Sequence, residues 1–262
     1  MANIDKVLEI MAQLRDPENG CPWDVRQDFE SIASYTIEEA YEVVDAIEQG
    51  NMAELKEELG DLLLQVIFHA RMAEEQDLFD FQNVADCLAE KLVRRHPHVF
   101  AGEARENEEV INEAWEHGKS EERQQKAGGG TGVLHGIART LPALKRAQKL
   151  QKRAARAGFD WPVLDPVFAK IHEELEELKQ ALKDREQHRR IKEEMGDVLF
   201  TCVNLARHLN VDAEDALRAS NNKFERRFEC MERELEAQGK DIRGRKQQEL
   251  EELWQRCKRS IG

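Results

Sequence analysis

Acidic side chains at helical spacing form the densest set of potential metal ligands in this sequence. The segment from Glu173 to Asp197 begins and ends with an acidic cluster, and a polar turn separates the two clusters. Because side chains three positions apart share one face of a helix, Glu174 lies with Glu177 and Glu194 with Asp197. If the turn folds the helices antiparallel, these four carboxylates meet across the seam. Hard cations bind such oxygen ligands, so the sequence predicts a Mg²⁺ site, with Mn²⁺ as the alternative.

The same acidic pattern occurs a second time, in the first half of the chain. Both copies contain E-E-x-x-E, followed at nearly equal distance by E-E, one apolar residue and G-D. An internal repeat of this kind indicates two copies of one folding unit. Glycine inside a helix costs about 1 kcal/mol relative to alanine, so Gly60 and Gly196 predict close approach of another helix or a ligand. The metal ligands predicted in the first copy are Glu39, Glu42, Glu58 and Asp61.

Hydrophobic periodicity around both acidic segments predicts an all-α fold. The residues Asp-Pro, Asn-Gly and Cys-Pro within 16–24 predict a loop, and Pro97 is expected to end the helix that precedes it. The predicted helices span residues 4–15, 30–48, 53–76, 81–95, 107–125, 142–157, 166–183, 189–209, 213–238 and 247–259. The expected buried stripes of the first acidic helix pair consist of Ile37, Tyr41, Val44 and Ile47, and of Leu55, Leu59, Leu62, Leu63, Val66 and Ile67.

The repeat and the length of 262 residues predict two tandem helical bundle domains, residues 1–118 and 137–262, joined by a Gly-rich linker, residues 119–136. The net charge of −14 argues against nucleic acid as a partner. No apolar run is long enough to span a membrane, and the N-terminus does not resemble a signal peptide. The five cysteines are scattered, without a C-x-x-C motif, which predicts reduced, structural thiols in a cytoplasmic protein without a disulfide framework.

Basic and aromatic side chains follow each acidic pair at matching places. Lys223 and Arg227 share one helical face and could hold phosphate oxygens beside the metal, as Lys91 and Arg95 could in the first copy. The second copy also has Asn221, where the first has alanine. The tryptophans near the end of each copy are candidates for stacking on a nucleobase, although packing in a core is the commoner fate of tryptophan. These are Trp115 and Trp254.

Longer motifs carry a family resemblance over nearly the whole chain. They include DPENGCPWD, YTIEEAYEV, EELGDLL, RRHPHVF, GFDW, EEMGDVLF and NKFERRF, and through them the chain resembles the MazG family of nucleoside triphosphate pyrophosphohydrolases. The resemblance implies that each half is a small helical bundle and that a homodimer completes the bundles. It also implies Mg²⁺-dependent hydrolysis of ATP and other NTPs or dNTPs to the monophosphate and pyrophosphate, with broad choice of base and sugar.

The resemblance assigns roles mainly to the second half, which keeps the asparagine and is implied to be the main catalytic unit. Glu174, Glu177, Glu194 and Asp197 would bind the metal, and either Glu173 or Glu193 would act as the general base. Lys223 and Arg227 would offset charge on the leaving pyrophosphate. The first-half site would combine its four acids with Lys91, Arg95 and Trp115. The residues implied to surround the nucleotide are Lys170, His172, Glu173, Glu174, Lys192, Glu193, Asp197, Asn221, Lys223, Arg227 and Trp254.

Two other interpretations remain open at the level of sequence. The chain could be an acidic helical interaction protein, whose carboxylates form only a solvated face. This interpretation leaves the duplicated Gly-Asp pair unexplained. The chain could also be a hydrolase with narrow substrate choice, such as a dUTP or dCTP hydrolase. Enzymes of that kind usually have a single domain, so the tandem layout weighs against it.

Overall fold

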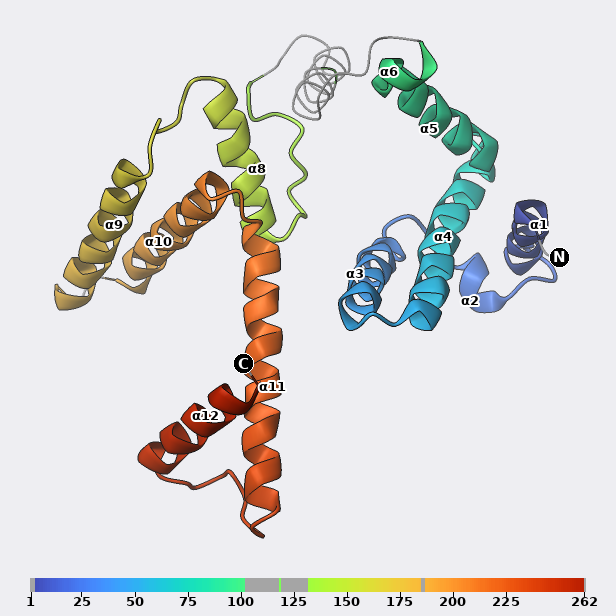
Figure 1. Ribbon diagram of the computed structural model, residues 1–262. Helices are drawn as coiled ribbons and strands as arrows, with labels where there is room; N and C mark the ends of the chain where they lie inside the picture. Colours follow the sequence, from blue (N-terminus) through green and yellow to red (C-terminus); the bar gives the residue numbers. More distant parts are fainter. Residues whose placement is uncertain (1–2, 102–117, 119–131, 185–186, 262) are drawn as a thin grey trace. The chain divides into compact units, whose positions relative to one another are not determined.

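The computed structural model describes residues 3–101, 118, 132–184 and 187–261, and these residues form α-helices and connecting turns (Figure 1). No strand occurs in these ranges, which confirms the all-α prediction. The chain divides into two compact units, Met1–Glu121 and Glu122–Gly262. The predicted helix at 107–125 and most of the predicted linker lie outside the described residues, so the domain limits stay predictions.

The first unit contains one long helical hairpin with shorter helices packed on it. Gly50, at φ 68°, ends α3 in the left-handed conformation that glycine adopts readily, and the side chain of Asn51 caps α4. Asp80 and Asn83 form a capping box at the start of α5. The helices are α1 (Ile4–Leu14), α2 (Pro22–Val25), α3 (Ala33–Gln49), α4 (Met52–Glu74), α5 (Phe81–Arg95) and α6 (Pro97–Phe100).

Two prolines start short helices that the sequence did not predict. Pro22 begins α2 inside the segment expected to be a loop, and Pro97 begins α6 directly after α5. The first turn of a helix tolerates proline because the backbone N–H that proline lacks would have no intrahelical partner at that position. Pro97 therefore ends one helix, as predicted, and also starts the next.

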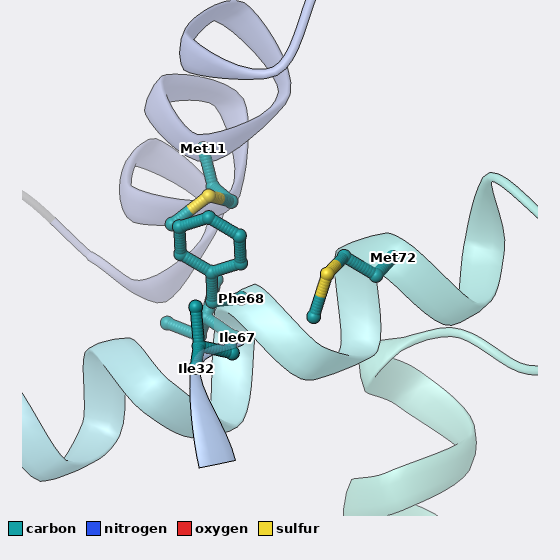
Figure 2. Packing of buried hydrophobic residues seen from close by; sticks show 5 residues of the cluster. All are labelled: Met11, Ile32, Ile67, Phe68 and Met72. Carbon is teal, nitrogen blue, oxygen red and sulfur yellow. The ribbon is translucent and has the colours of Figure 1, made fainter. Parts of the chain in front are cut away.

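The core of the first unit lies where α1 and the segment before α3 meet the C-terminal half of α4. Met11, Ile32, Ile67, Phe68 and Met72 are at most 4% exposed and pack on one another (Figure 2). Burying a side chain of this size stabilises a fold by about 1.5–3 kcal/mol. This cluster therefore fixes the end of α4 that lies away from the acidic residues.

The apolar stripe predicted for the first acidic helix is largely exposed in the described part of the chain. Ile37, Tyr41 and Ile47 are 49%, 45% and 54% exposed. On α4, Ile67 is buried as predicted, whereas Leu59 is 50% exposed. Among the described helices, only α4 packs extensively against α3. The described part of the chain thus buries the predicted stripes only in part.

The second unit repeats the hairpin and adds a long helix pair. Helix α9 (Asp165–Lys183) packs along α10 (His188–His208), and α8 (Ala143–Arg156) packs on α10 and α11. Helix α11 (Ala213–Glu236) extends past α8 and carries α12 (Gln247–Ile261) on its C-terminal half (Figure 1). Predicted helices that fall within the described residues are thus present in both units. None of the helices in the described ranges is long and apolar enough to cross a membrane.

One pair of cysteines contradicts the prediction that all thiols are reduced. Cys230 of α11 and Cys257 of α12 form a disulfide, while Cys21, Cys87 and Cys202 are free. The bonded residues are 27 positions apart and become neighbours only because α12 folds back along α11. The spacing of cysteines in the sequence does not report on this packing.

Candidate metal centres

Three of the four carboxylates predicted for the second half gather at one point. Glu174 on α9 and Glu194 and Asp197 on α10 have carboxylate oxygens within 4.8 Å of one another. Glu174 is 6% exposed and Glu194 only 1%. Glu177 lies one helical turn further along α9 and is exposed, outside this group. The antiparallel seam expected from the sequence is therefore present, with three acids rather than four.

The environment of the Glu194 carboxylate is the strongest indication of cation binding in this group. One of its carboxylate oxygens forms an ion pair with Arg190. Its other oxygen, Oε2, is buried without a hydrogen-bond partner among the described residues. Burial of a carboxylate oxygen is costly unless something satisfies it. A cation held between Glu174, Glu194 and Asp197 would do so, and the all-oxygen donor set fits Mg²⁺.

Two basic side chains, Lys170 and Arg190, form ion pairs with these acids. The Lys170 ammonium is 2.8 Å from Oε1 of Glu173 and 2.9 Å from Oε1 of Glu174. Hydrogen bonds to Glu173 and then to Glu174 hold the pKa of Lys170 far above its ordinary value, so this lysine stays charged. Sequence reasoning named Lys170 only through the family resemblance and missed Arg190. Both lie four residues before a site acid, so the i,i+4 rule could have found them.

The first half brings its acids together in the same way. Glu39 on α3 and Glu58 and Asp61 on α4 have carboxylate oxygens within 4.8 Å of one another, and Glu42 lies outside the group. Burial and then the charge of Asp61 raise the pKa of Glu39. Burial and then the charge of Glu42 raise the pKa of Glu58. The first site therefore concentrates negative charge.

The two sites differ in their counter-charges. At the places that match Lys170 and Arg190, the first half has Tyr35 and Glu54. Among the described residues, no lysine or arginine forms an ion pair with Glu39 or Glu58. Phosphate groups bring negative charge, so basic side chains at a metal site favour their binding. This difference favours the second half as the place where a nucleotide binds.

The raised pKa of Glu39 leads to a prediction about stability. A carboxyl whose folded-state pKa is raised costs stability as pH rises through that pKa, because the folded state disfavours its charged form. Without divalent cations, Glu39→Gln should therefore be more stable than the wild type at pH 7 but not at pH 4. We expect a difference of about 0.3–1 kcal/mol, the scale of interactions between largely exposed charges. Urea unfolding followed by circular dichroism measures it.

Magnesium provides the control for this prediction. Saturating Mg²⁺ should stabilise the wild type at pH 7, since the cation neutralises the charge repulsion, and should remove the advantage of Glu39→Gln. An advantage that is equally large at pH 4, or that persists in Mg²⁺, would mean that repulsion at this site is not its cause.

The glycines that precede the aspartates have open space beside them. A Cβ atom added at Gly60 or Gly196 would meet nothing within 4 Å. Among the described residues, therefore, no helix of the same chain approaches these glycines closely. The close approach of another helix or of a ligand at this face stays a prediction.

The phosphate and base candidates of the second half lie together on α11 and α12. The Arg227 guanidinium carbon is 5.8 Å from the ring centroid of Trp254. The Phe224 ring lies 5.3 Å from the same tryptophan. Trp254 is half-buried, and Lys223 and Asn221 are exposed on α11. Among the described residues, helix α9 packs extensively against neither α11 nor α12, and α10 makes only a small contact with α11.

The remaining predicted residues lie on α5, α9 and α10 or outside the described ranges. His172 Nδ1 is 2.8 Å from the Phe168 carbonyl oxygen, Lys192 is exposed, and Glu193 accepts a 3.0 Å hydrogen bond from Arg189. Lys91 and Arg95 lie on α5. Trp115 lies outside the described residues, so its place in the first site stays a prediction.

A third group with potential ligands consists of Cys230, Glu234 and Cys257. Its two sulfur atoms are bonded to each other. The thiolate is the form of cysteine that binds metals, so this group is not a metal centre while the disulfide is present.

Comparison with known proteins places both helical hairpins in one family. Residues 27–100 and 166–231 match the model described as MazG nucleotide pyrophosphohydrolase domain. The chain is 51% identical over 263 residues to a protein of Escherichia coli (strain K12) named nucleoside triphosphate pyrophosphohydrolase, covering 99% of this chain and 98% of the relative. It is 42% identical to the nucleoside triphosphate pyrophosphohydrolase/pyrophosphatase MazG of Thermotoga maritima, over 97% and 95% of the two chains. YabN of Bacillus subtilis, an uncharacterized protein, is 38% identical over 95% of this chain and 50% of its own length. The chain therefore belongs to the MazG family of nucleotide pyrophosphohydrolases.

Proposed function

We propose that this chain is a Mg²⁺-dependent nucleoside triphosphate pyrophosphohydrolase acting in the cytoplasm. It hydrolyses NTPs and dNTPs to the monophosphate and pyrophosphate, with broad base specificity, and so controls or sanitises nucleotide pools. The names of the relatives in E. coli and T. maritima support the reaction. The observation that carries the proposal is the buried Glu194 carboxylate, with one oxygen lacking a partner among the described residues, inside a three-carboxylate group.

The residues of the second site divide the work of this reaction. Glu174, Glu194 and Asp197 would hold the metal, with Glu177 within reach on the next turn of α9. Bound Mg²⁺ supplies the charge that polarises the α-phosphate and acidifies a water molecule. Glu173 or Glu193, at the exposed edge of the group, takes a proton from the attacking water at a carboxylate oxygen.

Basic side chains balance the negative charge of the substrate. Lys170 and Arg190 contact the acids in the structure. When a nucleotide binds, they are within reach of its phosphate oxygens. Lys223 and Arg227 stabilise the charge that develops on the leaving pyrophosphate as the bond from the α-phosphorus to the bridging oxygen breaks. The Trp254 ring stacks on the base, and a flat apolar contact of this kind is compatible with broad base choice.

The proposal includes a homodimer, because the hairpin faces are apolar and exposed in the single chain. Contiguous exposed apolar surface marks an interaction site. A second copy would cover these faces and could bring Lys223, Arg227 and Trp254 of one chain to the acids of the other. Sedimentation equilibrium should give the mass of two chains of 30.3 kDa each; an active monomer would overturn this part. The exposed residues on the second hairpin are Leu175, Leu182, Met195, Leu199 and Phe200.

The experiment that tests the function is an assay of pyrophosphate and monophosphate release from a panel of NTPs and dNTPs. With Mg²⁺ we expect turnover of several bases. With EDTA we expect loss of activity, and with added Mg²⁺ its recovery. Turnover of a single nucleotide would support the narrow-specificity alternative. No release with Mg²⁺ or Mn²⁺ would support the acidic interaction protein instead.

A further inference from the structure

The disulfide between Cys230 and Cys257 lies at the junction of α11 and α12. The two Cα atoms are 6.0 Å apart, and the bond closes a loop with a sequence separation of 27. Cys257 is fully buried in the cluster that Met231, Leu235 and Leu253 form, whereas Cys230 is partly exposed. A reagent in solution can therefore reach the bond from the side of Cys230.

Both sulfur atoms have polar neighbours that suit the thiol form as well. Cys257 Sγ is 3.7 Å from Oε1 of Glu234, which can accept the S–H group. Cys230 Sγ is 3.9 Å from Oγ of Ser260. A reduced pair would thus find a hydrogen-bond partner for each thiol without rearrangement of the core. The site can hold the dithiol and the disulfide.

The bond also lies one helical turn from two residues of the proposed nucleotide site. Arg227 precedes Cys230 by three residues on α11, and Trp254 precedes Cys257 by three on α12. An ion pair also joins these helices: Arg256 lies 3.3 Å from Glu234, and the two side chains are 49% and 38% exposed. Exposed ion pairs contribute little to stability. The disulfide is therefore a stronger constraint than this ion pair on how α12 is held against α11.

We propose that Cys230 and Cys257 form a reversible redox site that sets how firmly α12, and with it Trp254, is held on α11, and thereby the affinity for nucleotide. A thiolate of a dithiol reductant attacks Sγ of Cys230, and Cys257 leaves as a thiolate that takes up a proton. The second thiol of the reductant then displaces Cys230 and becomes oxidised to a disulfide. Oxidised glutathione re-forms the bond: one cysteine thiolate attacks it and releases one glutathione, and the second cysteine thiolate then displaces the other glutathione from the mixed disulfide. Only the effect on nucleotide affinity rests on the proposed function.

The test uses the full chain, prepared once with oxidised glutathione and once with dithiothreitol. Alkylation after denaturation should modify three cysteines in the oxidised protein and all five in the reduced protein. Hydrogen exchange within residues 247–261 should be faster in the reduced protein by on the order of a hundredfold, since the cross-link no longer restricts local opening. Affinity for a Mg²⁺ complex of a non-hydrolysable α,β-methylene ATP should fall at least about threefold on reduction.

Matched variants separate this site from other thiols. Cys202→Ser removes an exposed, free cysteine of α10 and should keep the full redox response. Cys230→Ser/Cys257→Ser should lose the response and exchange like the reduced wild type. The comparison of oxidised and reduced wild type stands even if the double variant does not fold.

Each outcome bears on the proposal separately from the catalytic function. Five reactive thiols in the oxidised protein, or equal exchange of α12 in both preparations, would overturn the redox site. A change in exchange without a change in analogue affinity would overturn its regulatory role. If the redox-dependent exchange appears but no preparation hydrolyses any nucleotide, the catalytic proposal fails while the redox site stands.

Discussion

Glu194→Gln is expected to lower pyrophosphate release by about 10²–10³-fold or more, the scale seen when one charge-stabilising group is removed from an active site. The amide has nearly the same shape as the carboxylate but lacks its charge, so the ion pair with Arg190 and a buried anionic ligand are both lost. The helices should persist, because only one side-chain atom changes. Initial rates at saturating Mg²⁺ and nucleotide, with circular dichroism as a check of folding, measure this effect.

The repeat supplies a matched control for this variant. Glu58→Gln makes the same change at the corresponding place of the first site, and we expect most of the activity to remain. Mg²⁺ binding at either site should raise the melting temperature. Glu194→Gln should lose the part of this rise that comes from the second site, and Glu58→Gln the part that comes from the first site. Loss of activity in Glu58→Gln alone would move catalysis to the first half. Equal partial losses would mean that both sites turn over substrate.

The grouping of the acids could be predicted from the sequence because it depends on local geometry. Helical spacing determines which side chains share a face, and a connection of few residues makes α9 and α10 antiparallel neighbours. Which acids meet depends on the relative shift of the two helices along the seam. Periodicity does not report this shift, and so Glu42 and Glu177 were expected in groups that the structure forms without them.

Burial could be predicted less well than secondary structure. The pattern at Ile37, Tyr41 and Ile47 correctly identifies an apolar face, but a pattern cannot say whether the same chain or another molecule covers it. Cys230 and Cys257 illustrate the same limit. Their pairing depends on how α12 packs on α11, and this packing is a contact between residues far apart in sequence.

Among the charged residues described in the first unit, Arg15 is the one whose substitution should lower stability most. It is 8% exposed, and its guanidinium donates to Oε1 of Glu75 at 3.0 Å and to Oε2 at 2.6 Å. It also donates to the carbonyl oxygens of Asp24 and Gln27 and lies 5.2 Å from the Phe68 ring centroid. One side chain thus joins the ends of α1, α2 and α4.

Arg15→Ala should therefore cost about 3–5 kcal/mol, the range for removing one partner of a buried ion pair. Burial acts to raise the pKa of Glu75, but Arg15 and then Arg71 outweigh it and hold that pKa below its ordinary value. A lowered carboxyl pKa contributes stability that is present at neutral pH and lost as pH falls through the folded-state value. The deficit of Arg15→Ala should accordingly be smaller at pH 3 than at pH 7.

Hydrogen exchange resolves the effect to the first unit. In Arg15→Ala, amide hydrogens in peptides from α1 and α4 should exchange faster, because the lost stability makes opening of the first unit easier. The exchange rates of peptides from α9 and α10 should be unchanged. Arg71→Ala is the matched control, because Arg71 also contacts Glu75 but is 28% exposed, and its loss should cost less than about 1 kcal/mol. If the two variants proved equally stable, the anchoring role of Arg15 would be wrong. A stability loss confined to α1 would mean instead that Arg15 holds that helix alone rather than joining it to α4.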